Sequence, residues 1–237
     1  MIRRPSLKAV IFDFNGVIVD DEPLHKAALC QVLRDQGIEV TDDQYRHCFL
    51  GREDGDCFRF AFERAGRFLP SDQLETLVQH KFSLYHSLVQ RDLRLFPGAL
   101  ELVRQCALRY PIALASGARR CEIEFVLARF NLERVFRSIV SAEDVPQGKP
   151  EPLPFWKALE SLNWGLDPAS AILPGDCLVV EDSQAGVTAA LRAGMKVLAV
   201  THSLPPSSLS EAHLVVESLE VELPVLERVF ATGDPLS

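Results

Sequence analysis

Short apolar runs that stop abruptly at polar or turn-forming residues constrain the fold of this chain more than any other feature. The first run, residues 8–14, is rich in β-formers and stops at Asn15-Gly16, which is typical of a buried strand followed by a turn. Similar runs recur at residues 111–116, 135–141, 177–181 and 195–200. Continuous apolar strands of this kind are typical of a sheet that is covered on both faces.

Helical patterns with apolar residues three and four apart separate these runs, at residues 98–108, 119–130, 153–162 and 183–193. Strand and helix therefore alternate, which predicts an α/β fold with a Rossmann-like, doubly wound parallel sheet. In such sheets the reactive groups collect at the carboxyl ends of the strands. The residues that directly follow each apolar run are therefore the candidates for function.

The segment between the first two strands departs from this alternation. It has no convincing strand and consists of successive helical patterns at residues 24–36, 41–49, 52–65 and 71–89. We therefore expect a small α-helical domain at residues 18–92, inserted after the first strand. The core domain is then formed by residues 1–17 and 93–237.

The charge balance restricts the possible partners. The 237 residues include 25 Lys and Arg against 33 Asp and Glu, a formal net charge of -8, which argues against a broad nucleic-acid surface. No apolar stretch is long enough to span a bilayer, so we expect no membrane partner. The six cysteines are scattered without a CxxC pair, and we expect reduced thiols and a cytoplasmic location. Nothing in the sequence indicates an oligomeric state.

Polar residues follow four of the predicted strands and should meet at one edge of the sheet: Asp13, Asn15, Ser116, Lys149, Glu181 and Asp182. Three carboxylates that converge with no arginine nearby repel one another, and a hard divalent cation with oxygen ligands relieves that repulsion. Magnesium is the natural choice. A lysine and a small hydroxyl beside the ion suit the oxygens of a phosphoryl group, so these residues predict phosphoryl transfer.

Four ordered motifs carry a family resemblance: Val10-Ile-Phe-Asp-Phe-Asn-Gly-Val17, Leu114-Ala-Ser-Gly117, Gly148-Lys-Pro-Glu-Pro152 and Val180-Glu-Asp-Ser-Gln-Ala-Gly-Val187. Together they resemble the motifs of the haloacid dehalogenase superfamily, and the match extends over nearly the whole chain. The helical insert resembles the small α-helical cap of that superfamily. The residues within the motifs are most similar to those of the branch that contains β-phosphoglucomutases and sugar-phosphate phosphatases.

The resemblance implies a role for each strand-end residue. Asp13 would be the nucleophile that forms an aspartyl phosphate, Ser116 would bond a phosphoryl oxygen, and Lys149 would neutralise charge on both. Taken one at a time these three are ordinary turn or surface residues, but their joint placement argues against that interpretation. The implied magnesium site consists of Asp13, the backbone carbonyl of Asn15, Glu181 and Asp182. Asp182 would be a direct ligand, and Glu181 would act directly or through water.

Asn15 is where the sequence departs from the family pattern. In the phosphatases and mutases of the family this position is a second aspartate, which acts as general acid and then as general base. A carboxamide donates a hydrogen bond but does not shuttle a proton. Loss of a positioned acid or base typically costs roughly 10²–10⁴ in rate, and most where the leaving group is a poor one such as a sugar alkoxide.

The resemblance therefore leads us to expect a magnesium-dependent phosphatase of a small phosphorylated metabolite similar to a sugar phosphate, weakened or made selective by Asn15. The alternatives are a non-catalytic or very slow phospho-metabolite binding protein and a β-phosphoglucomutase-like phosphotransferase. Dehalogenase and phosphonate-cleaving branches do without the second aspartate. However, dehalogenases need no magnesium, and phosphonate cleavage uses a cap lysine that residues 51–54 lack.

Three cap residues are candidates for substrate binding. Arg52 has a place similar to that of a substrate-phosphate arginine in the phosphoglucomutase branch, where it would clamp a second anionic group. The alternative is an exposed helix-start charge paired with Glu53 or Asp54. His25 and Lys81 occupy plausible positions facing the cleft, with a solvated helix residue as the alternative for either.

In the core domain, the backbone N–H groups of Gly117 and Ala118 are further candidates for substrate binding. They lie just after the second predicted strand, where we expect a helix to start. A helix start presents unpaired N–H groups that suit an anion.

Overall fold

The computed structural model describes residues 5–50 and 52–231, so Gly51 lies outside the described residues. Six parallel strands form one sheet in the order β5-β4-β1-β6-β7-β8. Their bounds are β1 (Ala9–Phe12), β4 (Ile112–Ala115), β5 (Ser138–Val140), β6 (Cys177–Glu181), β7 (Lys196–Val200) and β8 (Leu214–Val216). The predicted α/β, Rossmann-like parallel sheet is therefore confirmed, with β8 as a strand that the sequence patterns did not indicate.

The order of the strands creates a switch point beside β1. From β1 the chain adds β4 and β5 on one side, and then returns to add β6, β7 and β8 on the other side. Every residue of β1, β4 and β6 is buried, which explains why these strands are continuous apolar runs. Loops that follow strands on either side of a switch point diverge, and they leave room for a ligand at the carboxyl ends.

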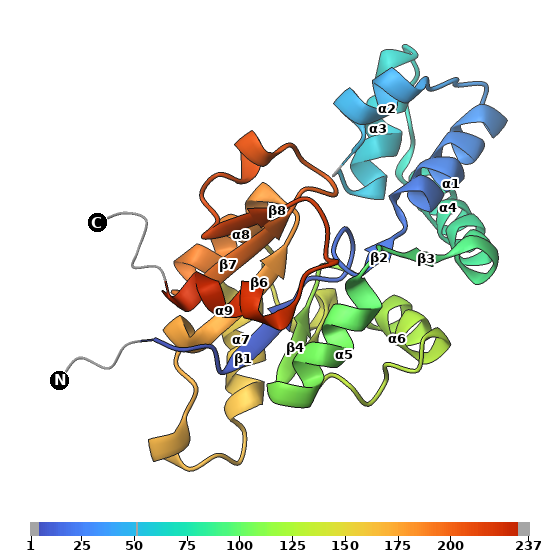
Figure 1. Cartoon of the computed structure of the whole chain (residues 1–237). Helices are drawn as coiled ribbons and strands as arrows, with labels where there is room; N and C mark the ends of the chain where they lie inside the picture. The colour runs from blue at the N-terminus through green and yellow to red at the C-terminus, as the bar shows by residue number, and fades with distance from the viewer. Residues whose placement is uncertain (1–4, 51, 232–237) are drawn as a thin grey trace. The chain divides into compact units, whose positions relative to one another are not determined.

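Helices cover both faces of the sheet (Figure 1). Their bounds are α5 (Ala99–Arg109), α6 (Arg120–Arg129), α7 (Leu153–Asn163), α8 (Gln184–Arg192) and α9 (Leu223–Ala231). On one face α7 and α8 bury Phe155 and Val187 against strand residues such as Ile11 and Val179. Because side chains alternate along a strand, Val10 points to the opposite face, where α5 and α9 contact each other.

The chain divides into two compact units, which we call the core unit (residues up to Asp20 and from Leu95 onward) and the cap unit (Asp21–Arg94). The cap unit consists of helices α1 (Glu22–Asp35), α2 (Asp42–Cys48), α3 (Asp54–Arg64) and α4 (Ser71–Asp92). The two-residue strands β2 (Val19–Asp20) and β3 (Arg94–Leu95) pair where the chain passes between the units.

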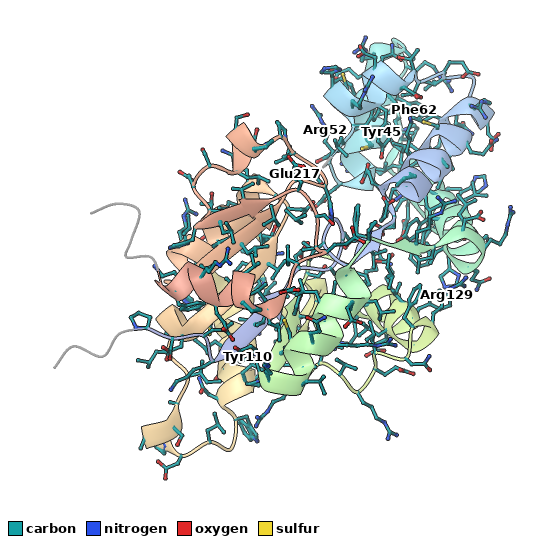
Figure 2. All side chains as sticks on the ribbon, in the orientation of Figure 1. Tyr45, Arg52, Phe62, Tyr110, Arg129 and Glu217 are labelled. Carbon is teal, nitrogen blue, oxygen red and sulfur yellow. The ribbon has the colours of Figure 1, made fainter. Side chains whose placement is uncertain are left out.

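The cap unit has a hydrophobic core of its own. Phe58 and Phe62 of α3 pack with Leu33 of α1 and Tyr45 of α2, and Figure 2 labels Tyr45 and Phe62 within this unit. Helix α2 begins with a capping box, in which Thr41 Oγ1 accepts from Gln44 N–H and the Gln44 side chain accepts from Thr41 N–H. Among the described helices, none is both long enough and apolar enough to cross a membrane.

Candidate active site

The carboxyl ends of the central strands bring together the polar residues that the sequence singles out. Asp13 follows β1, Ser116 follows β4, and Glu181 is the last residue of β6. Asp182 comes next, and Lys149 lies in the loop after β5. Oxygens of Asp13, Glu181 and Asp182 lie within 4.8 Å of one another, and all three residues are buried.

Lys149 bridges two of these carboxylates. Its Nζ donates to Asp13 Oδ1 and, at 2.5 Å, to Glu181 Oε1. Burial alone would lower the pKa of Lys149, but the two carboxylates raise that pKa above its usual value. Lys149 therefore carries a positive charge beside Asp13.

Glu181 is held in place by hydrogen bonds from its own loop. Its Oε2 accepts from the backbone N–H groups of Asp182 and Ser183, at 3.0 and 3.1 Å, and from Ser183 Oγ at 2.9 Å. The side chain is fully buried, and a Cβ built at Gly186 would overlap its carboxylate. With Oε1 taken by Lys149, the Glu181 carboxylate is engaged by protein donors at both oxygens.

Asp182 packs against the loop that follows β1. A Cβ built at Gly16 would overlap the Asp182 carboxylate, and Gly16 has a φ of +80°, a conformation that favours glycine. The loop is closed by Gly16 N–H, which donates to Val19 O at 2.9 Å. Glycine at position 16 therefore lets the loops after β1 and β6 approach each other closely.

The crowding of carboxylates changes how they titrate. Burial, together with the charges of Glu181 and Asp182, raises the pKa of Asp13 to about 8, although Lys149 opposes the rise. Burial and the charge of Glu181 raise the pKa of Asp182 to about 6. One lysine thus faces three carboxylates that would carry excess negative charge when ionised. Buried hard oxygen donors with excess negative charge fit a divalent cation such as Mg²⁺.

Ser116 and Asn15 are neighbours at this edge. Ser116 is buried, and its Oγ donates to Asn15 Oδ1 at 3.5 Å, a long hydrogen bond. Asn15 also forms an isolated β-bridge with Val19, so it belongs to the same tight loop as Gly16. The carboxamide therefore lies where the family pattern has its second aspartate, two residues beyond Asp13.

The loop after β7 contributes two residues that the sequence analysis missed. Ser203 Oγ donates to Asp182 Oδ2, and His202 Nδ1 bonds the carbonyl oxygen of Gly16 at 2.9 Å. The sequence offered a signal, since Thr201-His202-Ser203 directly follows a predicted strand. Neither His202 nor Ser203, however, belongs to one of the four motifs.

Of the two backbone N–H groups expected to suit an anion, at Gly117 and Ala118, the one at Ala118 is already hydrogen-bonded. Helix α6 begins at Arg120, one residue after the start of the predicted helical pattern, and Ala118 N–H donates to Ser116 Oγ at 3.0 Å. The first N–H groups of the helix region are also taken up, since Arg119 N–H donates to Glu122 and Arg120 N–H to Glu143. Gly117 is exposed and has no other atom near the position of a Cβ.

In the cap unit, His25 and Lys81 contact each other. Lys81 Nζ lies 2.7 Å from His25 Nδ1 and 2.8 Å from Asp54 Oδ1, and the Lys81 side chain is buried. His25 Nε2 lies 3.4 Å from Asp21 Oδ2, and the His25 ring stacks on Tyr85. Lys81 is therefore not a solvated helix residue but a buried side chain paired with the half-buried His25 and Asp54.

Arg52 lies on the surface of the same unit, where Figure 2 labels it. Its guanidinium packs over the ring of Phe60, 4.8 Å from the ring centroid. Asp54, one of the two carboxylates considered as its partner, pairs with Lys81 instead.

The strand order, with its switch point beside β1, and the helices on both faces of the sheet define an α/β protein of the Rossmann-like class. The chain belongs to the haloacid dehalogenase-like hydrolase family, whose family model matches residues 10–200.

Individual relatives agree with this assignment. The chain is 32% identical to the phosphorylated carbohydrates phosphatase of Thermotoga maritima, over 84% of this chain and 87% of the relative. It is 30% identical to hexitol phosphatase B of Escherichia coli, over 82% of this chain and 84% of the relative. The crystal structure of a candidate β-phosphoglucomutase from Thermotoga maritima is similar with a TM-score of 0.75 and 31% identity, covering 94% of this chain and all of that one.

Proposed function

We propose that the protein hydrolyses a small phosphate monoester, similar to a sugar phosphate, through an aspartyl phosphate on Asp13 and with the help of Mg²⁺. The observation that carries the proposal is the sharing of Lys149 between Asp13 and Glu181, with Asp182 alongside. A carboxylate that lies at the carboxyl end of a central strand beside a fixed positive charge is suited to attack phosphorus. The relatives named as carbohydrate and hexitol phosphatases support the choice of substrate class.

In the first step an Asp13 oxygen attacks phosphorus, and the bond to the leaving oxygen breaks with its electron pair. In the second step water attacks the same phosphorus, which releases inorganic phosphate and returns the Asp13 carboxylate. Lys149 stabilises negative charge on the transferred group in both steps, and the Ser116 hydroxyl donates to one of its oxygens. Splitting the displacement in this way replaces one difficult step by two easier ones.

Mg²⁺ would be held by Asp13, Asp182 and the backbone carbonyl of Asn15, and it would supply charge neutralisation for the phosphoryl oxygens. Because Lys149, Ser183 and backbone donors engage both oxygens of Glu181, we assign Glu181 an indirect contribution, through water. This donor set consists of hard oxygens only, which suits Mg²⁺ rather than a softer ion.

For the substrate beyond its phosphoryl group, we assign recognition to Arg52, His25 and Lys81 of the cap unit and to the backbone N–H of Gly117, since Ala118 N–H already donates to Ser116 Oγ. The exposed Arg52 guanidinium is suited to a second anionic group. His25 and Lys81 form a fixed pair that would bind polar substrate groups.

Asn15 sets the expected rate. Its amide can donate a hydrogen bond to the leaving oxygen, but it has no proton to transfer, so a sugar alkoxide would leave slowly. Leaving groups that need no proton, such as p-nitrophenolate or a carboxylate, should leave normally. The same absence counts against a mutase, because returning the phosphoryl group to a second sugar hydroxyl also requires proton transfer. It favours as second candidate a protein that binds a phosphorylated metabolite and turns it over very slowly.

Release of phosphate from p-nitrophenyl phosphate with Mg²⁺, by the native protein and by Asp13→Asn, tests the proposal. Asn keeps the size of Asp13 but is a poor nucleophile, so turnover by the native protein and none by the variant is the expected result. Binding of metal and phosphate without turnover by either would instead favour the second candidate. Equal turnover by both proteins would contradict the assignment of Asp13.

A further inference from the structure

The segment 201–203 is the part of the site edge to which neither the motifs nor the mechanism assigns a role. It directly follows β7, which lies next to β6 in the sheet, so it reaches the same carboxyl edge as Asp182. His202 is half-buried and Ser203 is exposed, and both side chains point back to the loops that carry the site.

Ser203 fixes one oxygen of Asp182. The Ser203 hydroxyl donates to Asp182 Oδ2, while the backbone of Gly16 lies close enough to the same carboxylate that a Cβ at Gly16 would overlap it. The carboxylate is thus held between a donor on one loop and the backbone of another. The hydroxyl and the backbone together restrict the orientation of the Asp182 carboxylate.

His202 fixes the loop on the other side of Asp182. The carbonyl oxygen of Gly16 only accepts hydrogen bonds, so His202 Nδ1 must carry the proton in the bond between them. The ring stacks on Phe96, with centroids 3.8 Å apart and planes at 11°. Phe96 N–H in turn donates to Ile18 O at 3.0 Å. His202 therefore connects to the loop after β1 twice, once directly and once through Phe96.

We propose that Ser203 and His202 are positioning residues of the magnesium site, which hold the Asp182 carboxylate and the Asn15-Gly16 backbone in the arrangement that binds the ion. The inference rests on the proposed function, since it takes the ion to be held by Asp182 and the residue 15 carbonyl. Groups that hydrogen-bond to metal ligands orient them in advance, and their loss typically weakens metal binding by about 10–100-fold.

Manganese binding tests this role without depending on catalysis. Mn²⁺ can be titrated into the protein and the free ion followed by electron paramagnetic resonance. We expect Ser203→Ala to raise the dissociation constant about tenfold, while Ser203→Thr, which keeps the hydroxyl, stays close to the native value. Ser207→Ala, an exposed serine four residues further along, is the matched control and should bind like the native protein.

His202→Phe provides a second variant, because it keeps a ring to stack on Phe96 and removes the donor to Gly16. It too should weaken Mn²⁺ binding, with an unchanged midpoint of thermal unfolding in the absence of metal. Native-like Mn²⁺ affinity of both Ser203→Ala and His202→Phe would overturn the inference alone. A native protein that binds no Mn²⁺ would overturn both the inference and the magnesium site of the proposed function.

Discussion

At the scale of single residues, Lys149 partly neutralises the negative charge of the site. It contacts Asp13 and Glu181, and those carboxylates in turn hold it protonated. Replacing Lys149 by a neutral side chain would therefore leave two buried carboxylates without their positive partner. The cost of breaking a buried pair exceeds the net gain from forming it.

We therefore expect Lys149→Met to lower both turnover and stability. Phosphate release from p-nitrophenyl phosphate should fall by at least about 10²-fold, in line with loss of one charge-stabilising group. The free energy of unfolding in urea should fall by roughly 3 kcal/mol. Lys8→Met is the matched control, since Lys8 precedes the strand that Asp13 follows, and it should change neither quantity appreciably. Native turnover in Lys149→Met would contradict the role of Lys149.

At the scale of elements, the first turn of helix α8 packs closely against the Glu181 carboxylate. Ser183 caps the helix by accepting from Gly186 N–H at 3.0 Å, and its hydroxyl donates to Glu181. The absence of a side chain at Gly186 leaves the space that the Glu181 carboxylate occupies. The start of the helix and the position of the carboxylate therefore depend on each other.

Gly186→Ala should destabilise the protein, although helix propensity alone predicts that alanine stabilises a helix. Alanine in a helix is usually more stable than glycine by up to about 1 kcal/mol, but here the new Cβ would displace Glu181. We expect the free energy of unfolding, measured in urea, to fall by about 2 kcal/mol, as it does when a core is overpacked. Gly55→Ala in helix α3 is the control, because its Cβ would meet only the flexible end of Arg59, and it should be neutral or stabilising. A stabilised Gly186→Ala protein would refute this account of α8.

The same elements explain how much of the fold the sequence could predict. Strands such as β1 and β6 are buried on both sides, so their continuous apolar runs were readable, and the long helices had clear apolar spacing. Strand β8 has three residues, all partly exposed, which is too short for a pattern, and the same holds for the two-residue strands β2 and β3.

The sequence predicted the site residues that directly follow buried strands. It did not predict the residues whose positions depend on tertiary contacts between loops. Asp13, Lys149 and Glu181 were expected to meet at one edge, and they do. The support of Asp182 by Ser203 depends on how close the loops after β6 and β7 approach, which no local pattern encodes. The hydrogen bond from Ala118 N–H to Ser116 Oγ likewise depends on the conformation of the loop after β4, which the sequence pattern does not encode.

At the scale of the whole molecule, the carboxylate cluster links stability to pH and to metal. The folded protein raises the pKa of Asp13 from 3.8 to about 8 and that of Asp182 from 3.8 to about 6. A raised carboxyl pKa means that the folded state favours the protonated form. Without metal, the contribution of these groups to stability is therefore full below about pH 4 and is lost as pH rises toward about 8.

Mg²⁺ should reverse this loss, because it binds the ionised carboxylates and competes with protons. We expect the increase in Tm produced by Mg²⁺ to be larger near pH 8 than near pH 5, by scanning calorimetry at matched ionic strength. Asp182→Asn should largely abolish the increase at both pH values. An increase that is equal at both pH values in the native protein would contradict the link between these carboxylates and the ion.

The central claim is that Asn15 leaves the machinery for forming an aspartyl phosphate intact and removes the proton transfer. The most direct measurement compares native protein and Asn15→Asp on a panel of sugar phosphates and on acyl phosphates. We predict that Asn15→Asp gains roughly 10²–10⁴ in rate on a sugar phosphate. The gain on an acyl phosphate should be smaller, because its leaving group needs no proton and only the attack of water on the aspartyl phosphate is helped. If the native protein is already fast on a sugar phosphate and Asn15→Asp is no faster, the claim is wrong and asparagine itself serves the chemistry.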